Sequence, residues 1–282
     1  MELPRFEDAV LRSLRTEEVH VGLSGARVFR MYDDADRPVA VFKGVPPDRP
    51  DLARELDGEI SRTAWMARFG LATPRVLEHE SREDGPPRWV VSSHLPGVPA
   101  HEPETAREHP RLVELLAEAA RTIHASEVGA VEVGAVEVVR ERLAEQLERA
   151  RERVASGLVQ RSWQGSRYAG TDPARALAEV GHRVERAGPL PEVVTHGDFC
   201  LPNVLVTADG AWGLVDLGQA GVADPHRDLA AMVGSLLSPL NPQFGQADAD
   251  RFLDAYGRDR VDPELLSLHF GVDDFFWPVP PA

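Results

Sequence analysis

The stretch His196-Gly197-Asp198-Phe199-Cys200-Leu201-Pro202-Asn203, followed at Asp216 by a second aspartate, is the most informative part of this 282-residue chain. A carboxylate such as Asp198 can accept or orient the proton of a substrate hydroxyl. The amide of Asn203 and the carboxylate of Asp216 offer oxygen ligands for the Mg²⁺ that bridges nucleotide phosphates. Because phosphoryl transfer needs mainly positioning and charge neutralisation, this spacing predicts a phosphoryl-transfer site.

Short β-branched and apolar runs surround this stretch. One lies at 193–195 and one at 204–206, and a third at 212–215 leads into Asp216 after the turn signal Asp209-Gly210. The two metal-ligand candidates would then lie at the same end of a hairpin, as a shared metal requires. The plainer alternative, a turn aspartate and a capping asparagine, stays open at this point.

A glycine-rich turn and a lysine near the N-terminus are candidates for holding nucleotide phosphates. The turn Gly22-Leu23-Ser24-Gly25-Ala26 lies between two strand-like runs. The backbone N–H groups of Ser24 and Gly25 could approach phosphate oxygens, although such turns more often only close hairpins.

Lys43 ends the apolar run 39–42, where its ammonium could reach the α- and β-phosphates. A solvated lysine at a strand end is the alternative.

A predicted helix over residues 52–69 offers a carboxylate to hold this lysine. Asp51 is a possible N-cap for the helix, and Gly70 is its stop signal. Glu55 and Glu59 lie four residues apart on one face. We favour Glu59, because the apolar residues that follow it place it near the buried side. The alternative, that this glutamate faces solvent and pairs with no lysine, stays open.

The patterns predict an α+β protein of two lobes, residues 1–95 and 96–282. Strand signals dominate the first lobe, and its last strand runs into the break Pro96-Gly97-Val98-Pro99, where we place the hinge. The backbone of Ser93 and Leu95 would then be available to an adenine edge. Helices are expected over 111–125, 136–158, 173–187, 229–237, 250–256 and 263–270.

The composition narrows the class of protein. The net charge of −15 disfavours nucleic acid as a partner and weakly favours a cationic small molecule. The one cysteine, Cys200, excludes an intrachain disulfide. The charged N-terminus argues against a secretory signal, and no apolar run approaches the roughly 18 residues of a membrane span. We expect a cytoplasmic protein, monomeric or homodimeric, with no membrane partner.

These motifs resemble the aminoglycoside 3′-phosphotransferase family. The resemblance rests on Thr195–Asp198, on Leu201–Asn203 and on the run from Gly213 to Ala230, which contains Gly213-Leu214-Val215-Asp216-Leu217-Gly218. The ending 268–276, with its acidic and aromatic residues, also resembles that family. About residues 15–276 are covered; the motifs in 195–230 are specific and those in the first lobe are looser.

The resemblance implies a protein-kinase-like fold, with a small β-rich lobe, a larger helical lobe and ATP between them. It implies transfer of the γ-phosphoryl group of ATP to a sugar hydroxyl of an antibiotic, which gives resistance. The roles that it implies are catalysis by Asp198, Mg²⁺ binding by Asn203 and Asp216, phosphate contact by Lys43 paired with Glu59, and structural support of the catalytic loop by His196 and Asp228.

The acceptor side departs from the family pattern. The loop 158–168 lacks the acids that members use to clasp ammonium groups, and it carries two arginines. Gln219 stands where many members have arginine. Six residues follow Phe276, where members usually end. Gln219, Asp273, Asp274 and Phe276 remain the candidates for contact with the acceptor. Two carboxylates are few for a polycation, whose ammonium groups are costly to desolvate.

Three functions therefore stay open. The first is an ATP-dependent antibiotic phosphotransferase that acts on an aminoglycoside. The second keeps the chemistry but takes a less cationic acceptor, such as a nucleoside or other glycosylated antibiotic, or a small metabolite. The third is a nucleotide-binding protein without transferase activity, which the complete set of Asp198, Asn203 and Asp216 argues against.

Overall fold

The structure is a computed structural model that describes residues 3–19, 25–82, 85–109, 111–128, 139–159, 168 and 170–276. The chain forms two compact units. The first comprises residues 1–98 and 203–220, and the second comprises residues 99–202 and 221–282. The hairpin segment that carries Asn203 and Asp216 thus groups with the N-terminal residues. The assignment of nucleotide binding to residues 1–95 and of catalysis and acceptor binding to residues 96–282 stays a prediction.

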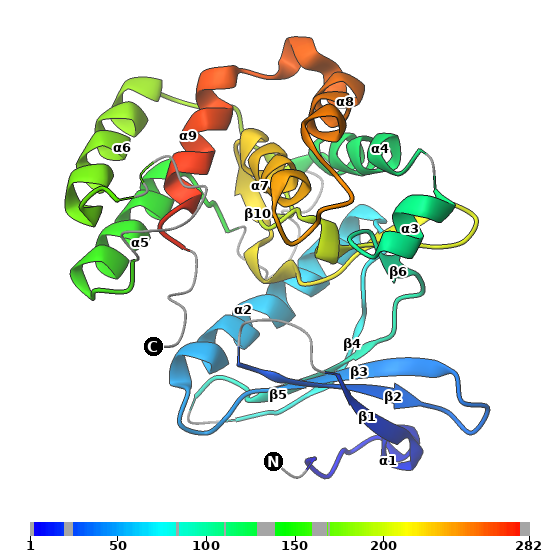
Figure 1. Ribbon diagram of the computed structural model, residues 1–282. Helices are drawn as coiled ribbons and strands as arrows, with labels where there is room; N and C mark the ends of the chain where they lie inside the picture. Colours follow the sequence, from blue (N-terminus) through cyan, green and yellow to red (C-terminus); the bar gives the residue numbers. More distant parts are fainter. Residues whose placement is uncertain are drawn as a thin grey trace. The chain divides into compact units, whose positions relative to one another are not determined.

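A five-stranded antiparallel sheet dominates the first unit (Figure 1), in the order β1-β2-β3-β5-β4. Along each strand, successive side chains point to opposite faces of the sheet. The elements of this part are α1 (Ala9–Ser13), β1 (Arg15–Val19), β2 (Arg27–Tyr32), β3 (Pro38–Gly44), α2 (Pro50–Met66), η1 (Ala67–Phe69), β4 (Val76–His79) and β5 (Trp89–Ser93).

Both faces of this sheet are covered. Val91 and Phe42 are buried with Phe6 and the N-terminal segment, whereas Val90 packs with Leu56 of α2 on the other face. Because Lys43 follows Phe42 in β3, its side chain emerges on the α2 face. The strand pattern therefore delivers the lysine to the helix that carries the glutamates.

Helix α2 confirms the predicted helix, with changes at its start. The N-cap is Arg49, so the prediction that Asp51 caps the helix is wrong. Pro50 takes the first helical position, which suits its fixed φ and missing N–H. The Asp51 carboxylate instead binds the Arg49 guanidinium at 2.6 Å, which lowers the pKa of Asp51 to about 2. At the other end Gly70 has a left-handed φ of 72°, as a helix stop requires.

A short hairpin completes the first unit. Strands β8 (Val204–Val206) and β9 (Trp212–Leu214) pair antiparallel, and β6 (Val98–Pro99) is the third strand of their sheet. The 3₁₀ turns η3 (Leu201–Asn203) and η4 (Leu217–Gln219) flank the hairpin. The strands predicted at 204–206 and 212–215 are thus confirmed.

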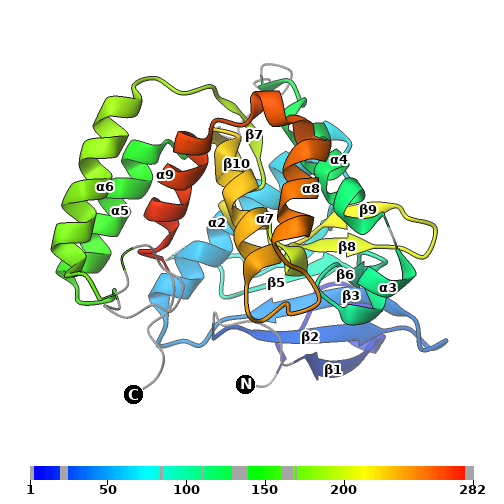
Figure 2. The ribbon, with the colours of Figure 1, turned by 45° about the horizontal axis from the view of Figure 1, so that its top comes forward.

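The second unit is mainly helical (Figure 2). Helix α8 packs on α4 and on α7, α7 also packs on α9, and α5 and α6 pack on each other and on α9. A two-stranded antiparallel ladder joins β7 to β10. The elements are α3 (Pro103–Glu108), α4 (Leu112–His124), α5 (Leu143–Ala155), α6 (Pro173–Ala187), β7 (Val193–Thr195), β10 (Gly221–Ala223), α7 (His226–Leu237), α8 (Gln246–Gly257), η5 (Arg258–Arg260) and α9 (Pro263–Asp273).

The helix predicted over 136–158 is described only from residue 139 on, and there its start is wrong. Helix α5 starts at Leu143, and the residues before it run beside β10, where Arg140 forms a bridge with Val222. The Glu141 N–H donates to the Val222 carbonyl at 3.0 Å, so a tertiary partner claims this backbone. In contrast, α7 and α8 begin earlier than predicted, at His226 and Gln246.

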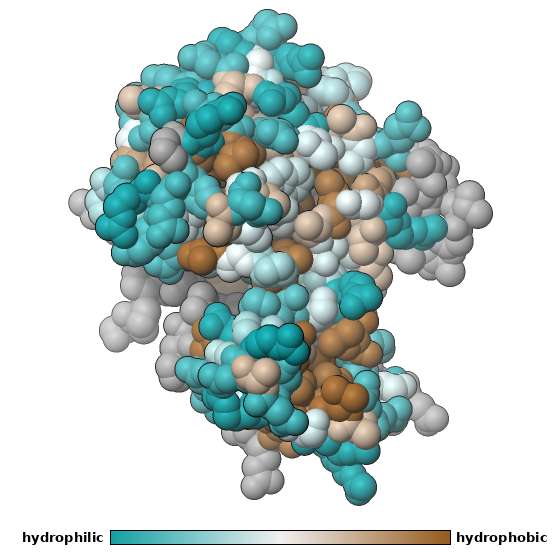
Figure 3. All heavy atoms as spheres, turned by 90° about the vertical axis from the view of Figure 1, so that its right-hand side faces the viewer, coloured by the Kyte–Doolittle hydropathy of each residue, from teal (hydrophilic) through white to brown (hydrophobic). Residues whose placement is uncertain are grey.

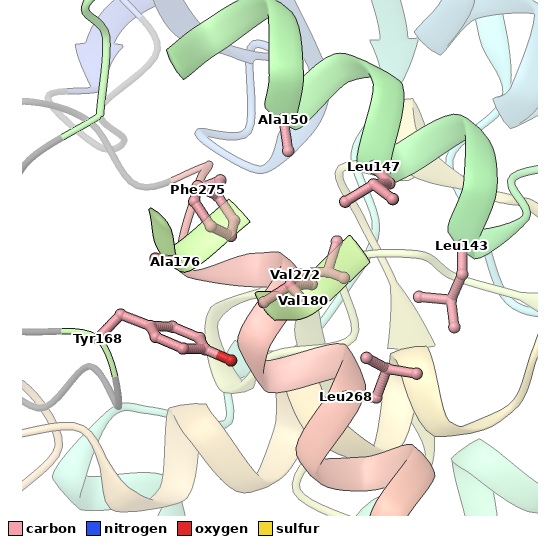
Figure 4. Close-up of a cluster of buried hydrophobic side chains, with 9 residues drawn as sticks. All are labelled: Leu143, Leu147, Ala150, Tyr168, Ala176, Val180, Leu268, Val272 and Phe275. Atoms are coloured by element: carbon pink, nitrogen blue, oxygen red, sulfur yellow. The ribbon is translucent and has the colours of Figure 1, made fainter. Parts of the chain in front are cut away.

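Helices α5, α6 and α9 share an apolar core (Figure 4). Leu147 of α5, Val180 of α6 and Val272 of α9 point into it, and Phe275 and Tyr168 close it. This core fixes the C-terminal end of α9, where the predicted acceptor residues begin.

The face drawn in Figure 3 mixes hydrophilic and apolar side chains, and apolar residues adjoin one another in the lower part of the view. Among the described residues, no helix combines the length and the apolar character needed to cross a membrane. The cytoplasmic location stays a prediction.

Candidate active site

Lys43 and Glu59 form the ion pair that the sequence favoured. The Lys43 Nζ lies 2.5 Å from Glu59 Oε2, between β3 and α2. Both side chains are mostly buried, at 23% and 20% exposure. Burial by itself would lower the pKa of Lys43, but the carboxylates of Glu59 and Asp216 outweigh it, so the pKa is raised and the ammonium stays charged. Glu55, the other candidate, is exposed.

The hairpin brings Asn203 and Asp216 to one end of the first unit, as the sequence predicted. The Val215 N–H donates to the Asn203 carbonyl at 3.0 Å, directly beyond the paired residues Val204 and Leu214. Asp216 Oδ1 lies 3.8 Å from Lys43 Nζ, and its side chain is 55% exposed. One amide oxygen and one carboxylate oxygen are hard donors of the kind that Mg²⁺ takes beside water and phosphate, so this pair fits the predicted metal.

Close packing explains why position 213, three residues before Asp216, is a glycine. A Cβ on Gly213 would lie 2.6 Å from Leu95 Cδ2 and 3.1 Å from the Ala72 carbonyl oxygen. The next residue, Leu214, donates its N–H to that same carbonyl at 2.8 Å. A larger residue at position 213 would therefore force the Leu95 side chain to move and would crowd the Ala72 carbonyl.

The predicted adenine hinge has one unused donor. The Ser93 N–H donates to the Arg75 carbonyl at 2.8 Å, and the His94 N–H donates to the Val39 carbonyl at 2.9 Å. Among the residues that the structure describes, the Leu95 N–H has no hydrogen-bond partner. Of the hinge N–H groups at 93–95, that of Leu95 is thus available to a ligand.

The glycine-rich turn is only partly described. Ser24 and the residues from 20 to 23 lie outside the described residues. Gly25 has a left-handed φ of 75°, and Arg49 Nη1 is the atom nearest to its missing Cβ, at 3.6 Å. The phosphate contacts of Ser24 and Gly25 stay predictions.

The loop that carries Asp198, the predicted catalytic residue, lies in the second unit and is held by a buried carboxylate. Asp228 is fully buried in α7 and accepts the His196 N–H at 2.8 Å and the Gly197 N–H at 2.7 Å. His196 is buried too, and its Nδ1 lies 3.3 Å from the Asp198 backbone nitrogen. The structure thus joins His196 and Asp228 around the start of the loop that carries Asp198, as expected of supporting residues.

Two further residues of this network escaped the sequence analysis. His124 Nε2, at the end of α4, lies 3.2 Å from Asp228 Oδ2, and His124 Nδ1 lies 2.8 Å from the Tyr256 hydroxyl. Burial favours the neutral carboxyl of Asp228, but the hydrogen bond from His124, the nearby charges of His124 and His196 and the His196 N–H together outweigh burial and lower the pKa of Asp228. Burial, and then the nearby charge of Asp228, raise the pKa of Tyr256 to about 12. The only signal in the sequence was a histidine at a helix end, which is a common place for histidine because the imidazolium complements the helix dipole.

A second buried carboxylate anchors α9. Asp224 Oδ1 lies 2.9 Å from His226 Nδ1 and 3.1 Å from His269 Nε2. His226 Nε2 accepts the N–H of Asp262, the N-cap of α9, at 2.8 Å. Burial favours the neutral acid, but the two imidazole donors lower the pKa of Asp224 to about 2. The start and the middle of α9 are therefore tied to one carboxylate.

The predicted acceptor residues lie in two places. Asp273, Asp274 and Phe276 follow each other at the end of α9 in the second unit, whereas Gln219 lies in η4 of the first unit. Arg153 donates to the Phe275 carbonyl at 2.7 Å, and the guanidinium carbons of Arg149 and Arg153 lie 5.9 and 5.8 Å from the centroid of the Phe276 ring. These contacts with α5 fix the acidic and aromatic ending.

A family comparison decides what kind of protein this is. The model of the family described as "Phosphotransferase enzyme family" matches residues 15–267. The chain belongs to this family. The aminoglycoside 3′-phosphotransferase of Streptomyces fradiae is 35% identical to this phosphotransferase over 263 residues, which cover 92% of this chain and 94% of the relative. The streptomycin 3″-kinase of Streptomyces griseus is 31% identical over 268 residues, with 92% and 91% covered.

Solved structures agree with this assignment. An aminoglycoside 3′-phosphotransferase of type VIII superposes with a TM-score of 0.77 at 30% identity, and 94% of each chain is covered. The aminoglycoside phosphotransferase APH(3″)-Id of Streptomyces rimosus, solved with ADP and streptomycin, gives a TM-score of 0.68 at 25% identity, with 93% of this chain and 92% of that chain covered. The predicted α+β, protein-kinase-like fold and the prediction of an enzyme that transfers phosphoryl groups are confirmed.

Proposed function

We propose that this phosphotransferase moves the γ-phosphoryl group of ATP to a hydroxyl of an aminoglycoside antibiotic and so gives resistance to it. The convergence of Lys43, Glu59 and Asp216 in the first unit carries this proposal. A buried, charged lysine beside an exposed metal-binding carboxylate is the arrangement that holds nucleotide phosphates. Relatives that act on aminoglycosides, and one solved with ADP and streptomycin, support the donor and the acceptor.

The chemistry follows from the residues. The Asp198 carboxylate orients the acceptor hydroxyl and takes its proton, while the acceptor oxygen forms a bond to the γ-phosphorus. The bond from the γ-phosphorus to the bridging oxygen breaks, and ADP leaves. Asn203 and Asp216 would hold the Mg²⁺, which neutralises the charge on the phosphates. Lys43 draws the α- and β-phosphates into place, and Glu59 fixes the direction of its ammonium.

Leu95 is the proposed contact for the adenine ring, because its N–H has no partner among the described residues. Ser93 would shape the same edge through its hydroxyl, which accepts the Arg75 N–H at 2.9 Å. On the acceptor side, Asp273 and Asp274 would attract ammonium groups and Phe276 would pack on a sugar ring, with Gln219 as a further polar contact.

A less cationic acceptor is the second candidate, and one observation favours it. Two guanidinium groups, those of Arg149 and Arg153, lie 5.9 and 5.8 Å from the centroid of the Phe276 ring, and Phe276 belongs to the same ending of the chain as the two carboxylates proposed to bind the drug. These cations weaken the local attraction for a polycation. A nucleoside or other glycosylated antibiotic with fewer ammonium groups would bind at a lower electrostatic cost.

The test is ATP consumption by the purified protein with Mg²⁺ against a panel of antibiotics. The panel holds kanamycin-type and streptomycin-type aminoglycosides, nucleoside antibiotics and macrolides. Turnover that depends on an aminoglycoside supports the first candidate, and turnover with only another compound supports the second. If the protein binds nucleotide but no compound of the panel supports turnover, the result would argue for a nucleotide-binding protein without transferase activity.

The catalytic assignment has its own test in the same assay. Asp198→Ala should lower kcat by at least about a hundredfold and leave ADP binding within about threefold of wild type, since a general base contributes 10²–10⁴-fold. Asp259→Ala, at an exposed position of η5, is the matched control and should keep full activity. Near-normal turnover of Asp198→Ala would remove this residue from the reaction.

A further inference from the structure

Helix α2 presents a second functional side chain, one turn beyond Glu59. Arg62 lies three residues after Glu59 and thus on the same side of the helix. Its Nη1 donates to the carbonyl oxygen of Gly218 at 2.7 Å. Gly218 belongs to η4, the turn that directly follows Asp216. Helix α2 therefore holds Lys43 through Glu59, and it holds the turn formed by Asp216 and η4 through Arg62. We call residues 216–219 the Asp216 turn.

The Asp216 turn has a backbone that needs external support. Asp216 adopts φ 56° and ψ 59°, the left-handed region that non-glycine residues seldom occupy. Such a conformation persists only where surrounding contacts impose it. The bond between Val215 and Asn203 lies just before Asp216, and the bond from Arg62 to Gly218 lies just after it.

The geometry around Gly218 shows that the turn lies against α2. A Cβ built on Gly218 would be 3.6 Å from Glu59 Cβ and 4.0 Å from Asp216 Oδ1. Leu217 of this turn is buried at 1% exposure, so apolar packing holds the turn in place. Arg62 adds a polar contact through its hydrogen bond to the Gly218 carbonyl.

We propose that Arg62 is a positioning residue for Asp216: its hydrogen bond to Gly218 fixes the turn that aims the Asp216 carboxylate at the Mg²⁺–nucleotide complex. This inference rests on the proposed function, because it takes Asp216 as a metal ligand. In this proposal Arg62 acts through the backbone of Gly218 and not by its own contact with the metal or the nucleotide. Its loss should weaken the part of nucleotide affinity that depends on Mg²⁺ and spare the part that does not.

The experiment measures the Kd of ADP by isothermal titration calorimetry, once with Mg²⁺ and once with EDTA, and needs no acceptor. In the wild type Mg²⁺ should tighten ADP binding, and Asp216→Ala should abolish the tightening. Arg62→Met keeps an apolar stem and removes the donor. It should reduce the tightening about tenfold, which corresponds to about 1.4 kcal/mol, and leave the Kd in EDTA unchanged.

Two controls separate this role from general destabilisation. Arg54→Met makes the same change at an exposed position of the same helix and should leave both Kd values unchanged. Arg62→Lys keeps a cationic donor and should retain the tightening within about threefold of wild type. Where Arg62→Met does not fold, Arg62→Gln, whose amide is too short to reach the carbonyl, takes its place.

The outcomes are distinct. Full Mg²⁺-dependent tightening in Arg62→Met would overturn the role of Arg62 and leave the proposed function intact. An equal loss of affinity with Mg²⁺ and with EDTA would also overturn it, since that result indicates a structural role alone. A wild-type protein whose ADP binding ignores Mg²⁺ would instead refute the metal site of the proposed function.

Discussion

Replacing Asp228 by asparagine is the sharpest test of how the loop that carries Asp198 is held. The carboxylate is fully buried and receives three donors, the N–H groups of His196 and Gly197 and the imidazole of His124. Asparagine offers one acceptor oxygen and turns an NH₂ group toward the remaining donors. At least one buried donor then loses its partner.

The expected cost follows from these contacts. A hydrogen bond to a charged group contributes about 1.5–3 kcal/mol, and an unsatisfied buried donor costs a similar amount. We expect a loss of about 3 kcal/mol in the free energy of unfolding, which corresponds to a fall of about 5 °C in Tm for a chain of this length. Because the pKa of Asp228 is lowered in the folded protein, its contribution is present above the ordinary value of 3.8 and is lost as the pH falls below it.

The assay is thermal unfolding at pH 7, followed by circular dichroism, with Asp254→Asn as the matched control. Asp254 pairs with Arg258 at the surface and is 65% exposed, so its loss should cost less than about 1 kcal/mol. In the activity assay, Asp228→Asn should lower kcat more than it raises the KM for ATP, since the loop with Asp198 is displaced. A Tm for Asp228→Asn within about 2 °C of the control, a margin that corresponds to about 1 kcal/mol or less, would refute the assigned network.

Two further predictions concern α9. Between pH 5 and pH 3 the free energy of unfolding should fall by about 1 kcal/mol more in the wild type than in Asp224→Asn, because His226 and His269 hold the pKa of Asp224 near 2 and its stabilisation is lost as the pH falls from 3.8 toward that value; parallel urea titrations check this, and equal slopes would contradict it. The double change Asp273→Asn with Asp274→Asn should raise the KM for a cationic acceptor at least about threefold, with the KM for ATP as internal reference; an unaltered acceptor KM would place these carboxylates away from the drug.

The sequence determined the chemistry of this protein because its signals were local. The hairpin after Asp198 follows from β-branched runs and a turn signal, and this pattern sets Asn203 and Asp216 at one end. The helix that carries Glu59 follows from its apolar periodicity and the stop at Gly70. Short-range spacing was sufficient here, because neighbours in the chain are neighbours in a hairpin or on a helix face.

Only the tertiary structure decided which distant residues complete the site. Glu59, and not Glu55, meets Lys43, because the pairing of β3 with its neighbours and the packing of α2 fix which side faces the lysine. The helix predicted from residue 136 starts at Leu143, because β10 claims the preceding backbone. His124 on Asp228 and Arg62 on Gly218 join residues more than 100 positions apart. No local pattern encodes such contacts, since a histidine or arginine on a helix finds its partner only when the helices pack.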